Sequence, residues 1–310
     1  MSHNMDDTGI RDQEMQRIND ELIRRLVERV PHSGKYPTAI AGLGITRWDE
    51  AETRDNCFYQ PAIGIILQGR KESLIGGELF HYGAFDCLVN GVDVPSLSRV
   101  LEATPEQPMF AVSLIIDKEL AMELVADMPP DNTTSPEVCP GVSLAPTEPE
   151  VLDVFHRLIQ LLDKPEQIPL MAPLLIREVI VRILMSQQGK TLRKIYQQGS
   201  YSHQIATAIA WLKDNYMQPL SVERLASHVH MATSTFHRQF KLVTSLSPLQ
   251  YQKRLRLYEA QKLMMVEYMD ANTAGLKVGY ESAQQFSREY KRLFGEPPYR
   301  NIQRLRQERA

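Results

Sequence analysis

Two short helix pairs flank one long helical segment in the last third of the chain, and this arrangement constrains the fold more than any other feature. The pairs cover about 221–243 and about 271–294, and a continuous helix is predicted over about 248–268. Each pair has a first helix with an apolar stripe, a short turn, and a second helix with aromatic side chains on one face. The long helix would span roughly 30 Å, close to the ~34 Å repeat of B-DNA. The sequence therefore predicts an all-helical domain with two similar helices about one DNA turn apart.

The second helix of each pair carries a polar face opposite its aromatic residues. Phe236 and Phe240 anchor the first of these helices at positions i and i+4, and Phe286 with Phe294 or Leu293 anchors the second. The polar side chains are Ser234, His237, Arg238 and Lys241 in the first helix, and Gln284, Gln285, Arg288, Lys291 and Arg292 in the second. Arg suits guanine edges, Gln suits adenine, and Lys suits phosphate. The pattern favours two readers of the major groove.

Charge is distributed unevenly along the chain. Residues 201–310 hold 16 Lys+Arg against 9 Asp+Glu, which leaves 19 against 29 for residues 1–200, because the whole chain has 35 and 38. The formal balance is thus +7 on the last third and −10 on the rest. A basic module joined to an acidic one indicates that the C-terminal part meets a polyanion. The alternative, chance unevenness on solvated faces, is less consistent with the helix pairs.

The first 187 residues have a different texture. An amphipathic helix is predicted over 10–30, and short apolar runs punctuated by Gly, Pro, Asn and Asp follow from about 37 to 116. These runs indicate a small antiparallel barrel or sandwich, with Gly76 and Gly77 in a hairpin turn. Helical periodicity returns at 117–127, 148–163 and 165–187. The last two segments form either a hairpin on the barrel or a dimer seam.

These patterns predict an α+β chain with three parts. Residues 1–187 form the N-terminal domain, the polar stretch 188–202 is the linker, and 203–310 form the helical domain. The start of the chain lacks a signal-peptide pattern, and no run reaches 18 uncharged apolar residues, so a cytoplasmic protein with no membrane partner is expected. The three cysteines, Cys57, Cys87 and Cys139, are too few and too far apart for a disulfide framework or a paired-cysteine zinc site.

Two segments near the C-terminus form a recognisable motif: Val278-Gly-Tyr-Glu-Ser282 and Gln285-Phe-Ser-Arg-Glu-Tyr-Lys-Arg-Leu-Phe-Gly-Glu-Pro-Pro298. Through them residues 203–307 resemble the DNA-binding domain of the AraC/XylS family of bacterial transcription regulators. The resemblance implies two helix-turn-helix units joined by a linker helix, with recognition helices at 233–241 and 283–291. Ser234 departs from members with a bulky aromatic residue at that position, so the base preference of the first helix is not inferred from theirs.

The resemblance also implies roles for single residues. The base-reading positions are Ser234, His237 and Arg238 in the first recognition helix, and Gln284, Gln285 and Arg288 in the second. Phosphate contacts are expected from Lys241, Ser282, Lys291 and Arg292.

The strand-rich region contains four characteristic segments: Tyr59-Gln-Pro61, Ile66-Leu-Gln-Gly-Arg-Lys71, Tyr82-Gly-Ala-Phe85 and Val92-Asp-Val-Pro95. Through them residues 35–185 resemble the AraC-associated N-terminal domain, which has a cupin-like barrel. This resemblance implies effector sensing, dimerisation, or both. His81 stands without the second histidine of a cupin metal site, and no nucleophile elbow or phosphate-binding loop occurs, so neither a metal, a cofactor nor catalysis is expected.

A barrel of this kind can hold a small molecule in its mouth. The expected effector contacts are Ile65, Leu67, Arg70, Leu88 and Phe110, with Lys71 as an alternative counter-charge for an anion. Cys57 and Cys87 offer a different hypothesis, in which a thiol reacts with an electrophile or oxidant. The simpler interpretation of both cysteines is that they are small buried hydrophobic residues.

The predicted function is sequence-specific transcription regulation modulated by a small effector. The expected partners are double-stranded promoter or operator DNA, the effector, a second copy of the chain, and RNA polymerase. Two alternatives remain open: an effector-independent dimeric regulator, and a metal-free cupin enzyme fused to a DNA-binding module.

Overall fold

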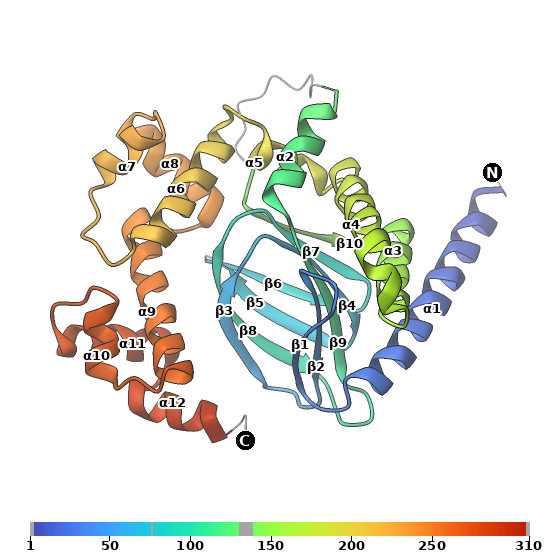
Figure 1. Cartoon of the computed structure of the whole chain (residues 1–310), viewed down its shortest axis with the longest axis horizontal. Helices are drawn as coiled ribbons and strands as arrows, with labels where there is room; N and C mark the ends of the chain where they lie inside the picture. The colour runs from blue at the N-terminus through green and yellow to red at the C-terminus, as the bar shows by residue number, and fades with distance from the viewer. Residues whose placement is uncertain (1–2, 76, 130–138, 308–310) are drawn as a thin grey trace.

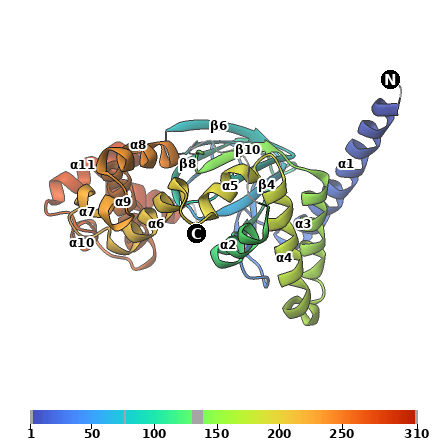
Figure 2. The same ribbon diagram turned by 90° about the horizontal axis from the view of Figure 1, so that it is seen from above.

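The computed structural model describes residues 3–75, 77–129 and 139–307, and the side chains of 3–10 and 55–57 fall outside this description. It confirms the α+β class, with a strand-rich N-terminal half and an all-helical C-terminal half (Figure 1). The barrel lies between a layer formed by α1 (His3–Arg29), α3 (Pro149–Leu161) and α4 (Ile168–Met185) and the C-terminal helices (Figures 1 and 2).

Two antiparallel sheets form the barrel. The strands are β1 (Gly34–Pro37), β2 (Leu43–Trp48), β3 (Arg54–Tyr59), β4 (Ala62–Gln68), β5 (Arg70–Ile75), β6 (Glu78–Gly83), β7 (Asp86–Asn90), β8 (Val94–Glu102), β9 (Met109–Ile115) and β10 (Val142–Pro146). One sheet has the order β1-β2-β9-β4-β7-β10 and the other β3-β8-β5-β6. Ile75 pairs with Glu78, as the predicted hairpin requires, and Gly76 of that turn lies outside the described residues.

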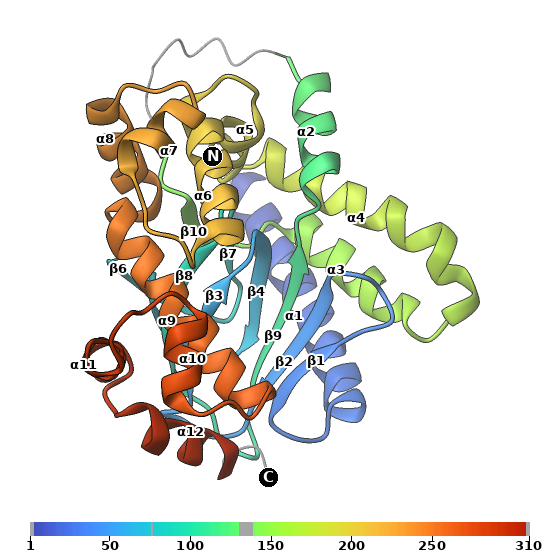
Figure 3. The same cartoon turned by 60° about the vertical axis from the view of Figure 1, so that its left-hand side comes forward.

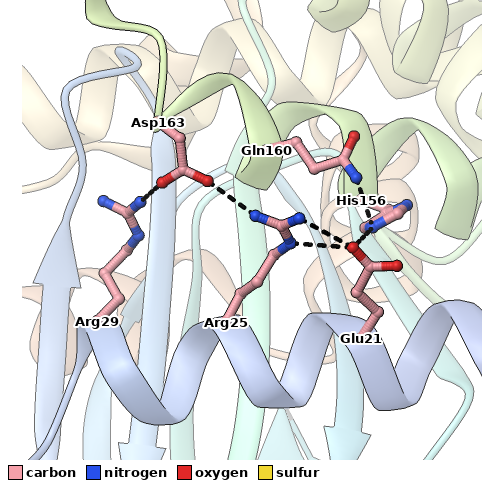
Figure 4. Close-up of polar contacts among 6 residues, drawn as sticks. All are labelled: Glu21, Arg25, Arg29, His156, Gln160 and Asp163. Atoms are coloured by element: carbon pink, nitrogen blue, oxygen red, sulfur yellow. Dashed lines mark hydrogen bonds and ion pairs between the residues drawn. The ribbon is translucent and has the colours of Figure 1, made fainter.

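A polar network joins α1 to α3 and to the turn that follows α3 (Figure 4). Asp163 accepts hydrogen bonds from Arg25, at 2.8 Å, and from Arg29. Glu21 pairs with Arg25 at 2.9 Å and lies 3.5 Å from His156 Nε2. Because Ile18, Leu22 and Leu26 on another face of α1 are buried, the helix is fixed by an apolar stripe with ionic contacts beside it.

The stretch predicted to be a polar linker contains a buried helix. Residues 189–196 form α5 (Gly189–Tyr196), in which Leu192 and Ile195 have no exposed surface. A Cβ on Gly91 would lie 2.5 Å from Ile195 Cδ1, so α5 packs directly against the barrel. The domain boundary remains a prediction, but this part of the segment is ordered and packed.

The C-terminal helices include the two predicted pairs and the predicted long helix between them, and a further helix, α12 (Pro298–Gln307), follows the second pair. The others are α6 (Tyr201–Asn215), α7 (Val222–His228), α8 (Thr233–Thr244), α9 (Pro248–Val266), α10 (Ala271–Lys277) and α11 (Ala283–Phe294). The N-terminal part also has α2 (Lys118–Asp127) and the short 3-10 helix η1 (Pro165–Gln167). We call α7 with α8 the first unit and α10 with α11 the second unit. The two units lie at opposite ends of α9 (Figures 1 and 3).

Candidate DNA-binding face and effector domain

The first unit presents the predicted polar face to solvent. Phe236 and Phe240 of α8 are fully buried, with ring centroids 5.5 Å apart. The four predicted contact residues lie on the outer side of α8 and are all exposed: Ser234, His237, Arg238 and Lys241. Since the aromatic pair fixes one face of α8 in the core, the opposite face is held outward in a constant orientation.

The second unit repeats this construction. Phe286 and Tyr290 of α11 have no exposed surface, and Ser282 caps the helix by accepting a hydrogen bond from Gln285 N at 3.3 Å. Gln284, Arg288, Lys291 and Arg292 are exposed, whereas Gln285 is half-buried. Ser282 is exposed as well, although its hydroxyl already serves as the cap.

The helices α8 and α11 are an internal repeat with an offset of 50 residues, visible in the pairs Phe236/Phe286, Arg238/Arg288 and Lys241/Lys291. Each helix ends in a left-handed residue, Ser245 at φ 58° and Gly295 at φ 81°. Two similar helices were predicted from their patterns, and the constant 50-residue offset between matching residues is a further sequence signal that α8 and α11 are equivalent.

An arginine that sequence reasoning missed joins the two units. Arg256, on α9, donates to the backbone oxygens of Tyr216 (2.7 Å), Gln218 (2.9 Å) and Gly279 (2.8 Å). Burial lowers the pKa of its guanidinium from the usual value. Gly279 lies in the turn of the second unit and Tyr216 precedes the first, so one side chain connects the loops of both.

Glu289 of α11 is a second residue that the sequence analysis did not single out. It is 7% exposed and accepts hydrogen bonds from Lys253 Nζ at 3.0 Å and from Tyr280 OH at 3.0 Å. Burial alone would raise its pKa, but the hydrogen bonds from Lys253, Gln285 and Tyr280 outweigh burial and hold the pKa below the usual value. The carboxylate therefore fastens α11 to α9 and to the turn before α11.

The linker helix α9 also contacts the barrel. Tyr251 OH donates to Asp93 O at 2.7 Å, and Tyr258 OH donates to Ser96 O at 2.9 Å. Phe58 of β3 makes edge contacts with both tyrosine rings, at 5.6 and 5.1 Å. Lys213 of α6 adds an ion pair to Asp93 at 2.7 Å. The helical domain is therefore docked on β3 and β8.

The five expected effector contacts do not gather on one face of the barrel. In the β4–β7 register Ile65 stands opposite Cys87, the neighbour of Leu88, so Ile65 and Leu88 point to opposite faces. Arg70 is exposed and ion-paired with Glu102 at 3.2 Å. The alternation of residues along a strand had not indicated which face of the sheet lies inside the barrel.

Leu67 and Phe110 lie near the α1 side of the sheet. Asn19 of α1 donates to Leu67 O at 2.8 Å. Phe110 lies 5.6 Å from the guanidinium of Arg47, which donates to Val30 O just after α1. Both side chains are buried.

A different set of polar groups converges on the inner face of the β3-β8-β5-β6 sheet. Ser73 Oγ lies 2.7 Å from both Tyr82 OH and Ser98 Oγ, and Tyr59 OH lies 2.9 Å from Ser98 Oγ. Lys71 is 6% exposed and its Nζ lies 5.7 Å from the centre of the Tyr59 ring. Lys71, the alternative counter-charge, is therefore the predicted cation that does lie inside.

The buried thiol is poorly suited to redox sensing. Cys87 is 1% exposed, and burial, with smaller effects of Asp86 and Glu148, raises the pKa of its thiol to about 12. A protonated thiol is a weak nucleophile. The side chain of Cys57 lies outside the described residues.

Among the residues that the structure describes, no group of three or more His, Cys, Asp or Glu is placed to hold a metal ion, and no helix has the length and apolarity needed to cross a membrane.

Comparisons with known proteins agree with this architecture. Residues 39–191 match the family model described as the AraC-type transcriptional regulator N-terminus, and residues 225–304 match a helix-turn-helix domain model. The transcriptional activator RhaS of Shigella sonnei is 24% identical over 234 residues, covering 75% of this chain and 78% of that protein. RhaS of Pectobacterium carotovorum is 28% identical over 100 residues, and the match spans 36% of that protein's length and 32% of this chain.

Solved structures of similar fold include two of ToxT from Vibrio cholerae. An apo form of a ToxT point variant has a TM-score of 0.57 at 11% identity, covering 86% of this chain and 98% of that chain. Wild-type ToxT bound to an unsaturated fatty acid has a TM-score of 0.54 at 10% identity, covering 84% and 95%. At this identity the likeness shows the fold alone. Together the two family models and the relatives define the class, and the chain belongs to the AraC family of transcriptional regulators.

Proposed function

We propose that the chain binds double-stranded DNA sequence-specifically through α8 and α11 and thereby regulates transcription. The observation that carries this proposal is the matched pair of recognition helices, each with a buried aromatic anchor and an exposed Arg and Lys at equivalent positions. The α9 helix between them has 19 residues, or about 28 Å of helix. This length is compatible with two major-groove segments one turn apart on one face of the duplex.

Within that interface the side chains divide by chemistry. Ser234, His237, Arg238, Gln284, Gln285 and Arg288 are the proposed base contacts, and Lys241, Ser282, Lys291 and Arg292 are the proposed phosphate contacts. The outward orientation of these side chains supports the assignment, and the excess of basic residues after residue 200 supplies the field.

The test is binding of the full-length protein to its own upstream DNA and to random duplex, each at two salt concentrations. We expect tighter binding to one upstream site and a log affinity that falls linearly with log salt. Lys291→Ala should weaken binding to both DNAs and reduce the salt slope by about 1. Equal affinity for every duplex at all salt concentrations would contradict sequence-specific reading.

For the N-terminal domain we propose binding of a small effector with an acidic group. The support is the buried Lys71, whose Nζ lies 5.7 Å from the centre of the Tyr59 ring, and the linked hydroxyls of Ser73, Ser98, Tyr59 and Tyr82. ToxT, a protein of similar fold, binds an unsaturated fatty acid. A convergent polar group in an apolar barrel is a common form of ligand site.

Thermal unfolding with and without oleate tests effector binding, with Lys71→Met as the variant that should lose any stabilisation. No shift with oleate or shorter fatty acids would favour the effector-independent regulator, and turnover of a bound compound would favour the enzyme alternative.

We further propose that the protein is a homodimer that uses α4. Leu170, Leu174 and Met185 are 76%, 61% and 70% exposed on this helix, and Met171 is 42% exposed. Apolar exposure of this kind is typical of interaction sites. Leu174→Glu should convert the dimer into a monomer in analytical ultracentrifugation, and an unchanged mass would refute α4 as the seam.

As a DNA-binding regulator the protein would act in the cytoplasm, and contact with RNA polymerase stays a prediction.

A further inference from the structure

The amide of Gln285 is tied to a buried carboxylate. Gln285 Nε2 donates to Glu289 Oε1 at 3.3 Å, one helical turn further along α11. The same carboxylate is held from two other elements, by Lys253 Nζ of α9 at 3.0 Å and by Tyr280 OH before α11 at 3.0 Å. Because Glu289 is 7% exposed and held by these two groups, it is a fixed point against which the Gln285 side chain is oriented.

The chemistry of the pair decides which end of the amide faces outward. An ionised carboxylate only accepts hydrogen bonds, so the NH₂ group of Gln285, and not its oxygen, must face Glu289. The pKa of Glu289 is held below its usual value by its donors against the opposing effect of burial, which keeps the carboxylate ionised at neutral pH. The amide oxygen of Gln285 has no hydrogen-bond partner among the described residues and is not among the buried unpaired atoms. It is therefore available at the surface.

We propose that Glu289 is a positioning residue for base specificity, which makes Gln285 present its oxygen to the DNA and so select a base with an amino group. In the major groove adenine offers N6–H₂ and cytosine offers N4–H₂ as donors, whereas guanine O6 and thymine O4 are acceptors. An outward amide oxygen accepts from the first two and repels the last two. This inference rests on the proposed contact of Gln285 with a base.

The first unit provides an internal contrast. The residues 50 positions earlier are Thr235 and Gln239 in place of Gln285 and Glu289. Gln239 is 4% exposed, and its Oε1 is buried without a hydrogen-bond partner. The carboxylate is thus not required to build this type of unit, because a neutral amide fills the equivalent place in α8. In α11 the carboxylate makes contacts beyond filling this place, to Lys253, Tyr280 and Gln285.

Selection of binding sites from a randomised duplex library by the full-length protein tests the proposal. Gln285→Ala identifies the base position that Gln285 contacts, because preference is lost there. At this position we expect the wild type to favour adenine and cytosine over guanine and thymine on the order of 10-fold. Glu289→Gln should reduce that ratio to about 2-fold, because a neutral amide at 289 can donate as well as accept and lets the Gln285 amide turn over.

A matched variant separates positioning from stability. Tyr280→Phe removes one hydrogen bond to Glu289 Oε2 and leaves Oε1 for Gln285, so it should lower stability and keep the base ratio. If Glu289→Gln weakens all sequences equally and leaves the ratio at the Gln285 position unchanged, Glu289 is merely structural and the proposal is wrong. If Gln285→Ala changes no position, the base contact itself fails, and the inference falls with it. Retention of the ratio in Tyr280→Phe with its loss in Glu289→Gln is the supporting result.

Discussion

The first unit shares its hydrophobic core with the barrel, whereas the second unit has a core of its own. Phe236 and Phe240 of α8 belong to one cluster that runs from α1 through the barrel to Leu255 in α9. Phe286 and Tyr290 of α11 belong to a separate cluster with the second half of α9 and α12. Two helices of equivalent sequence are therefore supported in different ways.

This difference gives the two recognition helices different relations to the N-terminal domain. Gly141 N, just before β10, donates to Val243 O near the end of α8 at 2.9 Å, so the first unit touches the barrel through its backbone. The second unit meets the barrel mainly through α9, where Tyr258 bonds to Ser96 O. A change inside the barrel is expected to reach α8 directly and α11 only by way of α9.

Truncation of the equivalent aromatic residues should have the largest effect and should show whether the two cores are independent. Phe236→Ala and Phe286→Ala each remove a fully buried ring, at a cost of about 3–5 kcal/mol. Hydrogen exchange should show that Phe236→Ala lowers the protection of barrel strands, because they share its core. Phe286→Ala should lower protection in α10 and α11 and leave the barrel unchanged. Equal loss of barrel protection in both variants would show that the cores are not independent.

The equivalent arginines should behave alike on DNA. Arg238→Ala and Arg288→Ala should each cost about 1–3 kcal/mol on the preferred site and relax the preference at one position only, with different positions for the two variants. Competition binding with single-base variants of the site measures this. Uniform weakening on cognate and random DNA would remove the residue concerned from the base-reading set.

Removing the hydroxyls of the α9 tyrosines should have a smaller effect on stability. Tyr251→Phe and Tyr258→Phe each remove one donor to a barrel carbonyl, at a cost of about 1 kcal/mol. Denaturant midpoints at constant slope measure the loss. Tyr299→Phe is the control, because Tyr299 is 69% exposed and its change should stay within about 0.5 kcal/mol. A loss of unfolding free energy as small as in this control would show that the two tyrosine hydroxyls do not hold α9 on the barrel.

Acidification below about pH 4.3 should affect the second unit more than the first. The pKa of Glu289 is lower in the folded chain than the usual value of about 4.3, so its contribution is fully present above that value and is lost as pH falls through the folded pKa. Gln239, at the equivalent place, does not titrate. Hydrogen exchange corrected for intrinsic rates should show α11 losing protection before α8 on acidification, and Glu289→Gln should remove the difference. An unchanged difference in that variant would assign the acid sensitivity to other carboxylates.

Much of this molecule follows from sequence because its helices depend on local patterns. The apolar spacing and the caps predicted the two helix pairs and the long helix between them within a few residues, whereas α12 was not predicted. The proposed base contacts Arg238 and Arg288 are exposed as expected. The order of helix and strand regions in the N-terminal domain was predicted as well, except for β10, which pairs with β7 in a stretch where no strand was expected.

The features that the sequence did not reveal depend on long-range packing. The polar appearance of 188–202 concealed α5, whose Leu192 and Ile195 are buried only because the barrel stands beside them. The expected effector contacts mixed both faces of a sheet, since alternation identifies which residues share a face and not which face is enclosed. Glu289 and Arg256 were missed because their partners lie 36 and 40 residues away, on other helices and turns.

Footprinting of the full-length protein on its selected site, with Arg238→Ala and Arg288→Ala beside the wild type, tests the two-reader account most directly. We predict two protected major-groove segments about 10 base pairs apart for each chain bound. Each variant should lose base protection in one segment and keep it in the other. A single protected segment, or the same segment lost in both variants, would show that one chain does not read DNA with both helices.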